Sequence, residues 1–326
     1  MDDTPGLIAD IGGTNARFAL VAPRSAEPLQ PLVLHCADYA GPAEAARSYL
    51  ERVGVERPPR RAAFAIASPV LGDRIEMTNH AWRFSVAQVR DRLDLEQLEV
   101  VNDFIAVAMA VPHLATVDKV AVGGGEATPG APVAVLGPGT GLGVSALVPT
   151  AGGWLPIATE GGHVTMAAAD DREAEVLAWL RQKQGHVSAE RVLSGPGLIN
   201  LYSALCGLAG HAAEPLSPAD LTRRAAAGDG RASETLEMFF AMLGTVAGNL
   251  ALTLGARGGV VIAGGIVPQL LPSFLASGFR RRFEDKGRFT GYLEHIPVHV
   301  ATHPYPAFLG LAGLVVSPDG YAATTI

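Results

Sequence analysis

The chain has 326 residues, of which 48% are hydrophobic, and carries a formal net charge of −7 with a pI of about 5.7. This length accommodates two domains with a large core, and this composition excludes an intrinsically disordered chain. A mildly acidic protein lacks the basic face that nucleic acid requires, so no nucleic-acid partner is expected. Cys36 and Cys206 lie too far apart in the sequence for metal or redox spacing, a usage that suits a reducing cytosol.

No membrane partner is expected either. The N-terminus is acidic and lacks the basic and apolar regions of a signal peptide, so a cytoplasmic protein is predicted. Residues 127–159 contain no charged residue and no histidine, but Gly and Pro interrupt this stretch throughout. A spanning helix needs about 20 consecutive apolar residues, so a buried β-hairpin explains the stretch better.

Along the chain, short apolar runs, Gly-rich turns and helical stretches alternate. Strands are predicted over residues 6–10, 17–22, 62–68, 99–103, 133–148 (two strands around a turn) and 258–268. Helices are predicted over residues 104–111, 171–205 (interrupted near Gly185 and at 194–197) and 218–256. Strands that alternate with helices predict an α/β protein.

Two of the Gly-rich turns share a pattern. DIGGTNARFALV and GPGTGLGVSALV, about 130 residues apart, each place glycines around a Thr and then a return strand. Such turns leave backbone N–H groups free to attract phosphate. A single Gly-rich turn is commonly a plain hairpin, but this pair and a third turn at 263–265 indicate two related half-domains that face one cleft.

Familiar nucleotide motifs are missing from these turns. No G-x-x-x-x-G-K-[ST] segment occurs, which excludes a P-loop nucleotidase. The glycines at 137, 139, 141 and 143 do not match G-x-G-x-x-G, and strand-like sequence follows them. The dinucleotide fingerprint must open a helix, so nicotinamide chemistry is disfavoured.

The first turn contains an acid that would repel phosphate. Asp10 lies two residues before Gly12 and Gly13. A Mg²⁺ ion between carboxylate and phosphate removes this conflict, because Mg²⁺ prefers such oxygens and keeps several waters. We predict that Asp10 holds hydrated Mg²⁺ while the backbone of residues 12–14 meets the phosphates. A plain hairpin that tolerates the Asp is the alternative.

Asn102 and Asp103 end a predicted buried strand, where α/β sheets place groups that bind ligands. A carboxyl group there is expected to be ionised near neutral pH and could take a proton from a hydroxyl that attacks phosphorus. Asn-Asp could equally cap the helix that begins at Phe104. The two roles are compatible with each other.

Glu160 and His163 form an E-x-x-H segment after another apolar stretch. Di-iron sites need two such motifs on helices, and Gly161-Gly162 is a poor helix interior, so metal ligation is disfavoured. The carboxylate of Glu160 and a neutral imidazole of His163 could provide hydrogen-bond acceptors and a donor to sugar hydroxyls. Alternatively, the segment is a surface turn with no function in binding. Glu190 is predicted in the first turn of a helix, where an acid complements the helix dipole. The charged run 283–289 is predicted to be a solvated loop.

The chain resembles the bacterial glucokinases of the non-zinc type, along nearly its whole length. The segments that carry this resemblance are ADIGGTNAR (9–17), MTNHAW (77–82), VVNDFIAVAMAVP (100–112), LGPGTGLGV (136–144), TEGGHV (159–164), GHVSAERVLSGPGLINLY (185–202), GGVVIAGGIVP (258–268) and FEDKGRF (283–289).

The resemblance implies ATP-dependent phosphorylation of D-glucose at its 6-hydroxyl with Mg²⁺. It also implies the ribonuclease-H-like (actin-like ATPase) α/β fold with the active site in an interdomain cleft, and a homodimer. The domains are expected at residues 1–113 with 303–326, and at 114–302. Wider relatives carry a Cys-rich zinc motif near the EGGH segment; this chain has no cysteine there, so no zinc is expected.

The family's functional positions match residues of this chain. Those implied for the nucleotide are Ala9, Asp10, Ile11, Gly12, Gly13, Thr14, Thr140, Gly141, Gly264 and Gly265. Those implied for the sugar are Asn102, Asp103, Glu160, His163 and Glu190, with Asp103 as the catalytic base.

Other functions fit the sequence less well. A broader kinase for mannose or fructose differs only in the orientation of single hydroxyls, which the residue types do not distinguish. A sugar-sensing regulator needs a DNA-binding module, and nine residues before Asp10 are too few for one. A non-catalytic ATPase of the actin-like fold is expected to lack the convergent groups for hydroxyls.

Overall fold

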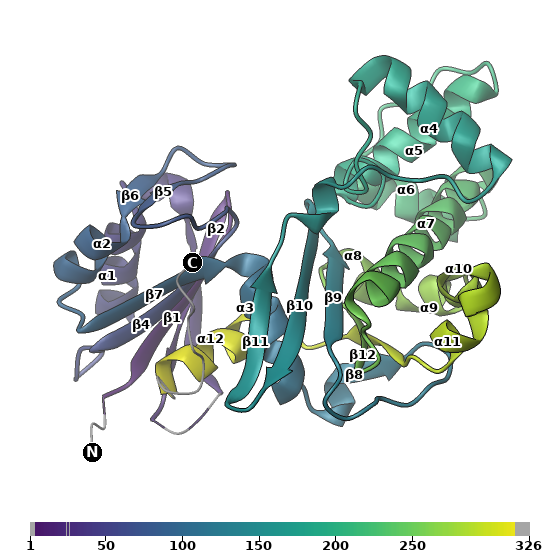
Figure 1. The fold of residues 1–326 in the computed structure, drawn as a ribbon. Helices are drawn as coiled ribbons and strands as arrows, with labels where there is room; N and C mark the ends of the chain where they lie inside the picture. The colour runs from purple at the N-terminus through teal and green to yellow at the C-terminus, as the bar shows by residue number, and fades with distance from the viewer. Residues whose placement is uncertain (1–3, 24, 26, 317–326) are drawn as a thin grey trace. The chain divides into compact units, whose positions relative to one another are not determined.

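The computed structural model describes residues 4–23, 25 and 27–316. The chain divides into two compact units (Figure 1). The first comprises Met1–Asp118, Leu147–Ala158 and His303–Ile326, and the second Lys119–Ala146 and Thr159–Thr302. The domain boundaries expected from the sequence stay a prediction, and their terminal residues 1–3 and 317–326 lie outside the described residues.

The first unit is built on a five-stranded sheet in the order β3-β2-β1-β4-β7. Its strands are β1 (Gly6–Ile11), β2 (Asn15–Val21), β3 (Pro28–His35), β4 (Arg61–Ile66) and β7 (Gln97–Asn102). Strands β1, β2 and β3 pair antiparallel, whereas β4 is parallel to β1 and to β7. A short separate hairpin is formed by β5 (Arg74–Glu76) and β6 (Arg83–Ser85).

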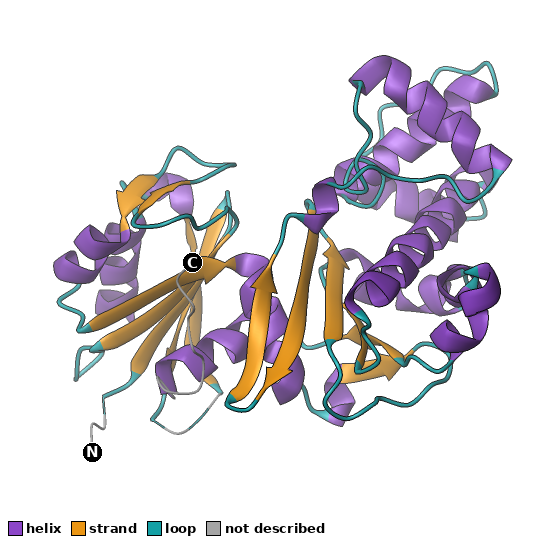
Figure 2. Ribbon diagram, in the orientation of Figure 1, coloured by secondary structure: helices purple, strands orange, loops and turns teal. Residues whose placement is uncertain are grey.

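Helices cover both faces of this sheet (Figure 2). Because side chains alternate along a strand, Leu7 and Ala9 enter one core while Ile8 enters the other. The first core includes residues of α1 (Pro42–Val53) and α2 (Val86–Arg92). The second includes residues of α3 (Asp103–Ala110) and α12 (Pro306–Val316), so the C-terminal helix returns to the first unit.

The pairing register brings two predicted site segments to the same edge of this sheet. Ile11 of β1 lies opposite Ile66 of β4, and Ile66 lies opposite Asn102 of β7. All three strands run parallel, so the β1–β2 turn and the β7–α3 junction lie at the carboxyl edge, about 10 Å apart across two strand spacings. This edge is where α/β sheets bind ligands.

The second sheet has the strand order β11-β10-β9-β12-β13-β8. Its strands are β8 (Lys119–Ala121), β9 (Val133–Pro138), β10 (Leu142–Thr150), β11 (Gly153–Ala158), β12 (Gly259–Ile262) and β13 (Val298–Ala301). Strand β12 is parallel to β9 and β13. Three consecutive strands followed by two later ones repeat the order of the first sheet, as two related half-domains would. That these half-domains face one cleft stays a prediction.

Helices make up nearly half of the second unit. They are α4 (Asp171–Gln184), α5 (Gly195–Leu208), α6 (Pro218–Ala226), α7 (Gly230–Leu254), α8 (Ile266–Gln269), α9 (Leu271–Leu275), α10 (Phe279–Glu284) and α11 (Thr290–Glu294). Asp229 is the N-cap of α7, and its carboxylate accepts from the N–H groups of Arg231 and Ala232. Gly255, in the left-handed conformation, is the C-cap.

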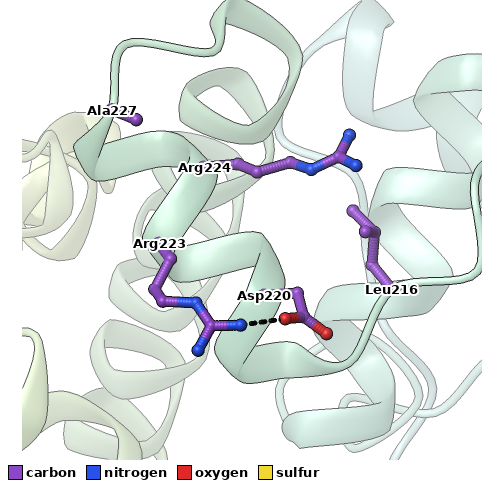
Figure 3. A pocket seen from close by; sticks show the side chains of 5 residues that line it. All are labelled: Leu216, Asp220, Arg223, Arg224 and Ala227. Atoms are coloured by element: carbon purple, nitrogen blue, oxygen red, sulfur yellow. Dashed lines mark hydrogen bonds and ion pairs between the residues drawn. The ribbon is translucent and has the colours of Figure 1, made fainter.

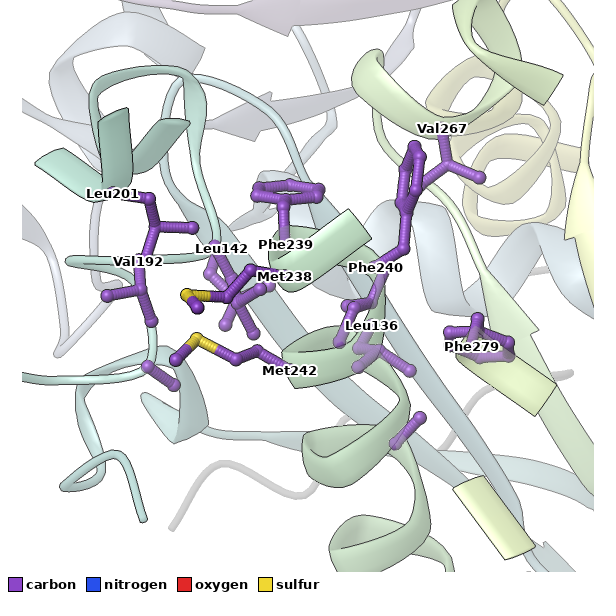
Figure 4. Packing of buried hydrophobic residues seen from close by; sticks show 14 of the residues in the cluster. Leu136, Leu142, Val192, Leu201, Met238, Phe239, Phe240, Met242, Val267 and Phe279 are labelled. Atoms are coloured by element: carbon purple, nitrogen blue, oxygen red, sulfur yellow. The ribbon is translucent and has the colours of Figure 1, made fainter. Parts of the chain in front are cut away.

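The core of the second unit is centred on α7 (Figure 4). Met238 and Met242 point toward Val192 and Leu201, while Phe240 lies beside Val267. By length and composition α7 could cross a membrane, but 72% of its apolar window is buried inside the protein. Core helices of folded proteins share this property, and the packing in Figure 4 accounts for the apolar sequence.

Most predicted elements are confirmed, with shifted ends. Residues 218–256 form two helices instead of one, because the capped turn at Gly228–Asp229 separates α6 from α7. SGPG at 194–197 starts α5 and does not merely interrupt a helix, since Ser194 is the N-cap and accepts from the N–H of Gly197. The solvated loop predicted at 283–289 is wrong in part, because Phe283 is fully buried on α10.

Candidate active site

The first predicted phosphate turn connects β1 to β2. The N–H of Gly12 donates to the carbonyl of Asn15 at 2.9 Å, and the carbonyl of Thr14 accepts from the N–H of Cys36 at 2.8 Å. Among the described residues, no protein acceptor meets the N–H of Gly13 or of Thr14. These two N–H groups follow Ala9, Asp10 and Ile11 at the carboxyl edge of the sheet, where they could donate hydrogen bonds to an anion.

Asp10 is half-buried and pairs across the hairpin with Arg17, with 3.1 Å between Oδ2 and Nη1. Burial raises the pKa of Asp10, and the positive charge of Arg17 opposes this shift. Because Arg17 already neutralises the carboxylate, a cation held through water fits this site better than a directly bound one. Within the described ranges no three His, Cys, Asp or Glu side chains could enclose a metal. Mg²⁺ still fits, since it uses one or two carboxylates, phosphate oxygens and waters.

Asn102 and Asp103 lie at the junction of β7 and α3. Asn102 is the N-cap of α3: its Oδ1 accepts from the N–H of Phe104 at 2.9 Å, and its Nδ2 donates to the carbonyl of Ser68 at 3.4 Å. The capping role weighed for this pair therefore belongs to Asn102. Asp103 is the first residue of the helix and is half-buried.

The second predicted phosphate turn, between β9 and β10, packs directly on the turn after β12. Gly264 has a left-handed φ of +81°, and a Cβ there would lie 2.5 Å from the carbonyl oxygen of Pro138. The parallel pairing of β9 with β12 thus places Thr140 and Gly141 and the Gly264–Gly265 pair at the same carboxyl edge. Thr140 is exposed there.

Three predicted sugar ligands converge in the second unit. Nε2 of His163 lies 3.8 Å from Oε2 of Glu160, and its Nδ1 lies 4.0 Å from Oε1 of Glu190. The side chains of Glu160 and His163 are 60% and 59% exposed, and that of Glu190 is 32% exposed. An imidazole between two accessible carboxylates presents alternating acceptors and donors, as a sugar requires.

Backbone pairing between two distant segments creates this cluster. The N–H of Glu190 donates to the carbonyl of Gly162, and the N–H of Ala189 donates to that of Val164, both at 2.9 Å. Glu190 lies in a tight turn before α5 and not in a helix, so its predicted placement in a first helical turn is wrong. The turn is fixed by the N–H of Leu193, which donates to the carbonyl of Ala189.

Three supporting residues escaped the sequence analysis. Arg17 pairs with Asp10, the carbonyl of Ser68 holds Asn102, and the N–H of Leu142 donates to Oε2 of Glu190 at 2.9 Å. Ser68 could have been identified from the sequence, because it lies at the end of a predicted strand, as Asn102 does. The contact of Glu190 with Leu142 could not have been identified in this way, since every residue type except proline has a backbone N–H.

Two hollows in the second unit lie away from these residues. One, of about 340 Å³, is lined by residues of α6 and its entry, including Asp220 and Arg223, which form an ion pair (Figure 3). The other, of about 740 Å³, is lined by residues of 125–128, Arg257 and 291–296. Neither contains a predicted site residue.

Comparison with known proteins identifies the family to which this chain belongs. The family model described as Glucokinase matches residues 7–317. The glucokinase of Paramagnetospirillum magneticum is 58% identical over 314 residues, which cover 96% of this chain and 98% of that one. The crystal structure of a glucokinase from an Antarctic psychrotroph matches with a TM-score of 0.87 at 39% identity, over 97% of this chain and 99% of that one.

A more distant structure shares the fold. The ROK family glucokinase of Streptomyces griseus, solved with glucose and AMPPNP, matches with a TM-score of 0.65 at 18% identity, over 95% of this chain and 99% of that one. These structures confirm the predicted actin-like (ribonuclease-H-like) sugar-kinase fold. With its paired Gly-rich turns and its cluster of carboxylates and imidazole, the chain belongs to the glucokinase family.

Proposed function

We propose that this protein phosphorylates the 6-hydroxyl of D-glucose with ATP, the first step of glucose entry into glycolysis. The observation that carries the proposal is the cluster of Glu160, His163 and Glu190 beside the Thr140–Gly141 turn. Sugar acceptors and a phosphate-binding turn within one unit are what a sugar kinase needs. The names of the relatives support the same substrate, and the AMPPNP in one of them supports ATP as donor.

The proposed mechanism assigns one task to each group of residues. Asn102, Glu160, His163 and Glu190 bind the sugar hydroxyls, and the turns at 12–14 and 140–141 with Gly264–Gly265 hold the nucleotide. Asp103 accepts the proton of the 6-hydroxyl as its oxygen attacks the γ-phosphorus. Mg²⁺ would be held by Asp10 through water and would supply charge neutralisation on the phosphates. The bound ligands would have to be shielded from water, the competing nucleophile, while the phosphoryl group is transferred.

Other parts of the proposal rest on the sequence and on the family resemblance. We expect a cytoplasmic homodimer with domains at 1–113 with 303–326 and at 114–302, and with no zinc, nucleic-acid or membrane partner. Elemental analysis of protein purified without added metal tests the zinc expectation, and stoichiometric zinc would contradict it. Light scattering of the purified protein tests the dimer.

The substrate assignment predicts a clear preference in a coupled assay with Mg²⁺-ATP and a panel of hexoses. We expect kcat/KM to be highest for glucose, because the relatives that match nearly the whole chain are glucokinases. The measurement is the initial rate of ADP formation for glucose, mannose and fructose at matched concentrations. A higher kcat/KM for mannose or fructose would replace the glucose assignment by a broader hexose kinase.

Asp10→Asn is expected to raise the KM for Mg²⁺-ATP about tenfold or more, since it removes a charged acceptor from the waters of the cation. Glucose affinity should stay unchanged. Burial raises the pKa of Asp10, so loss of its charge also relieves a desolvation penalty, and the variant should stay folded. Steady-state kinetics against Mg²⁺ and ATP give the result, with the exposed Asp38→Asn as control. Collapse of glucose affinity with an unchanged Mg²⁺ requirement would contradict the role of Asp10.

A further inference from the structure

The carboxylate of Glu190 lies against two parts of the second unit at once. Its Oε2 accepts from the N–H of Leu142 at 2.9 Å, directly after the Thr140–Gly141 turn. Its Oε1 faces Nδ1 of His163 at 4.0 Å. One carboxylate thus contacts both the turn assigned to phosphate and the side chain assigned to sugar.

Gly141 makes this contact possible. A Cβ on Gly141 would lie 2.5 Å from Oε2 of Glu190 and 3.3 Å from its Cδ, so the carboxylate occupies the space that any other residue's side chain would fill. The backbone of Gly141 is not in the left-handed region, so conformational freedom is not the reason for glycine here. The reason is the close approach of Glu190.

We infer that Glu190, seated on Gly141, is a positioning residue that couples sugar binding to the second phosphate turn. This inference rests on the proposed function and deepens it. A sugar hydroxyl that binds Glu190 fixes its carboxylate, and the fixed carboxylate holds the N–H of Leu142 and so the turn before it. By thermodynamic linkage, a nucleotide that orders the turn strengthens sugar binding by the same factor.

The geometry predicts an effect on ligands with little effect on folding. The atom that an added methyl group meets is the end of a flexible Glu side chain, which can rotate away. By contrast, a Cβ on Gly162 would meet the backbone carbonyl oxygen of Leu142 at 2.1 Å, which no side-chain rotation relieves. Gly141→Ala should therefore displace the Glu190 carboxylate, remove its bond to Leu142 and leave the fold intact.

Gly139→Ala is the matched control in the same turn. Nothing lies within 4 Å of a Cβ at Gly139, its backbone is not left-handed, and its hydrogen bonds to Gly141 and Gly195 use backbone atoms only. Both variants add one methyl group to the turn, but only the methyl group at position 141 would contact Glu190.

The experiment is calorimetry of the full chain with glucose, with AMPPNP, and with AMPPNP at saturating glucose. For Gly141→Ala we expect the glucose Kd to rise about tenfold to a hundredfold, as for the loss of a charge-assisted hydrogen bond. AMPPNP binding without glucose should change less than about threefold, and the gain in AMPPNP affinity that glucose produces in the parent should shrink. Gly139→Ala should keep the parental glucose Kd and melt like the parent. Gly141→Ala should melt cooperatively at a slightly lower temperature, because the N–H of Leu142 loses its acceptor.

Each outcome decides one question. If Gly141→Ala binds glucose like the parent, or if both variants lose glucose affinity equally, the positioning role of Glu190 on Gly141 is wrong. If the parent binds AMPPNP but no glucose, the proposed function itself fails.

Discussion

Asp103→Asn is expected to lower kcat about 10²–10⁴-fold while glucose still binds. Asn has nearly the same shape and still forms hydrogen bonds, but it cannot accept a proton from the sugar hydroxyl. A loose transition state for phosphoryl transfer places the loss toward the lower end of this range. Because the interaction is made mainly in the transition state, the loss should fall on kcat and not on the glucose Kd.

The test compares kcat from the coupled assay with glucose affinity from calorimetry. Asp103 is the first residue of α3, where an acid also stabilises the helix, by about 0.3–1 kcal/mol. Asp171 occupies the same position in α4, after the N-cap Asp170, and is exposed. Asp171→Asn therefore removes the same helix-dipole contribution without touching the proposed site, and it should keep parental kcat.

A folded Asp103→Asn protein with near-parental kcat would remove Asp103 as the base. The charge of Asp103 in the first turn of α3 would then still stabilise the helix. The helix cap would be unaffected, because Asn102 supplies it.

Glu173→Ala is expected to destabilise the second unit by about 3 kcal/mol. Glu173 is 2% exposed and accepts from Nη1 of Arg282 at 2.6 Å and from the N–H of Ala169 at 2.8 Å. Removal of one partner of a buried ion pair costs about 3–5 kcal/mol, because the other charge stays buried. The lower end applies here, since Arg282 keeps its ion pair with Asp170 at 2.9 Å.

Urea unfolding followed by tryptophan fluorescence measures this effect. Trp179 lies on the same helix as Glu173 and reports on the second unit. Glu175→Ala is the control, because Glu175 is exposed and its ion pair with Arg172 is at the surface, where such pairs contribute about 0–1 kcal/mol. Equal shifts of the urea midpoint in both variants would show that the buried network between α4 and α10 does not stabilise the unit.

Several features of the site could be predicted from the sequence because they depend on residues close together in the chain. The turn at 12–14 follows from two adjacent glycines, and the cap at Asn102 follows from an Asn before an apolar helix. The proximity of the β1–β2 turn to Asn102 could also be predicted, because the carboxyl ends of parallel strands lie at the same edge of a sheet. Their predicted contacts with glucose, ATP and Mg²⁺ stay predictions.

Other predictions failed where distant residues decide the outcome. Glu190 has the local sequence of a helix start, but its N–H pairs with Gly162 and its carboxylate with Leu142, which hold it in a turn. Residues 283–289 are charged and so predict a solvated loop, yet α10 packs on α7 and buries Phe283. In both cases the contacts join segments tens of residues apart, which composition and spacing do not reveal.

The α/β class, the two Gly-rich turns and the residue types available for sugar and phosphate follow from the sequence alone, because backbone conformation and apolar periodicity are local properties. The contacts of Glu190 with Leu142 and His163, and the ion pair of Arg282 with Glu173 at the start of α4, arise only in the folded chain. These contacts exist because packing of the cores brings side chains and backbone groups within hydrogen-bonding distance, and that distance depends on the whole fold.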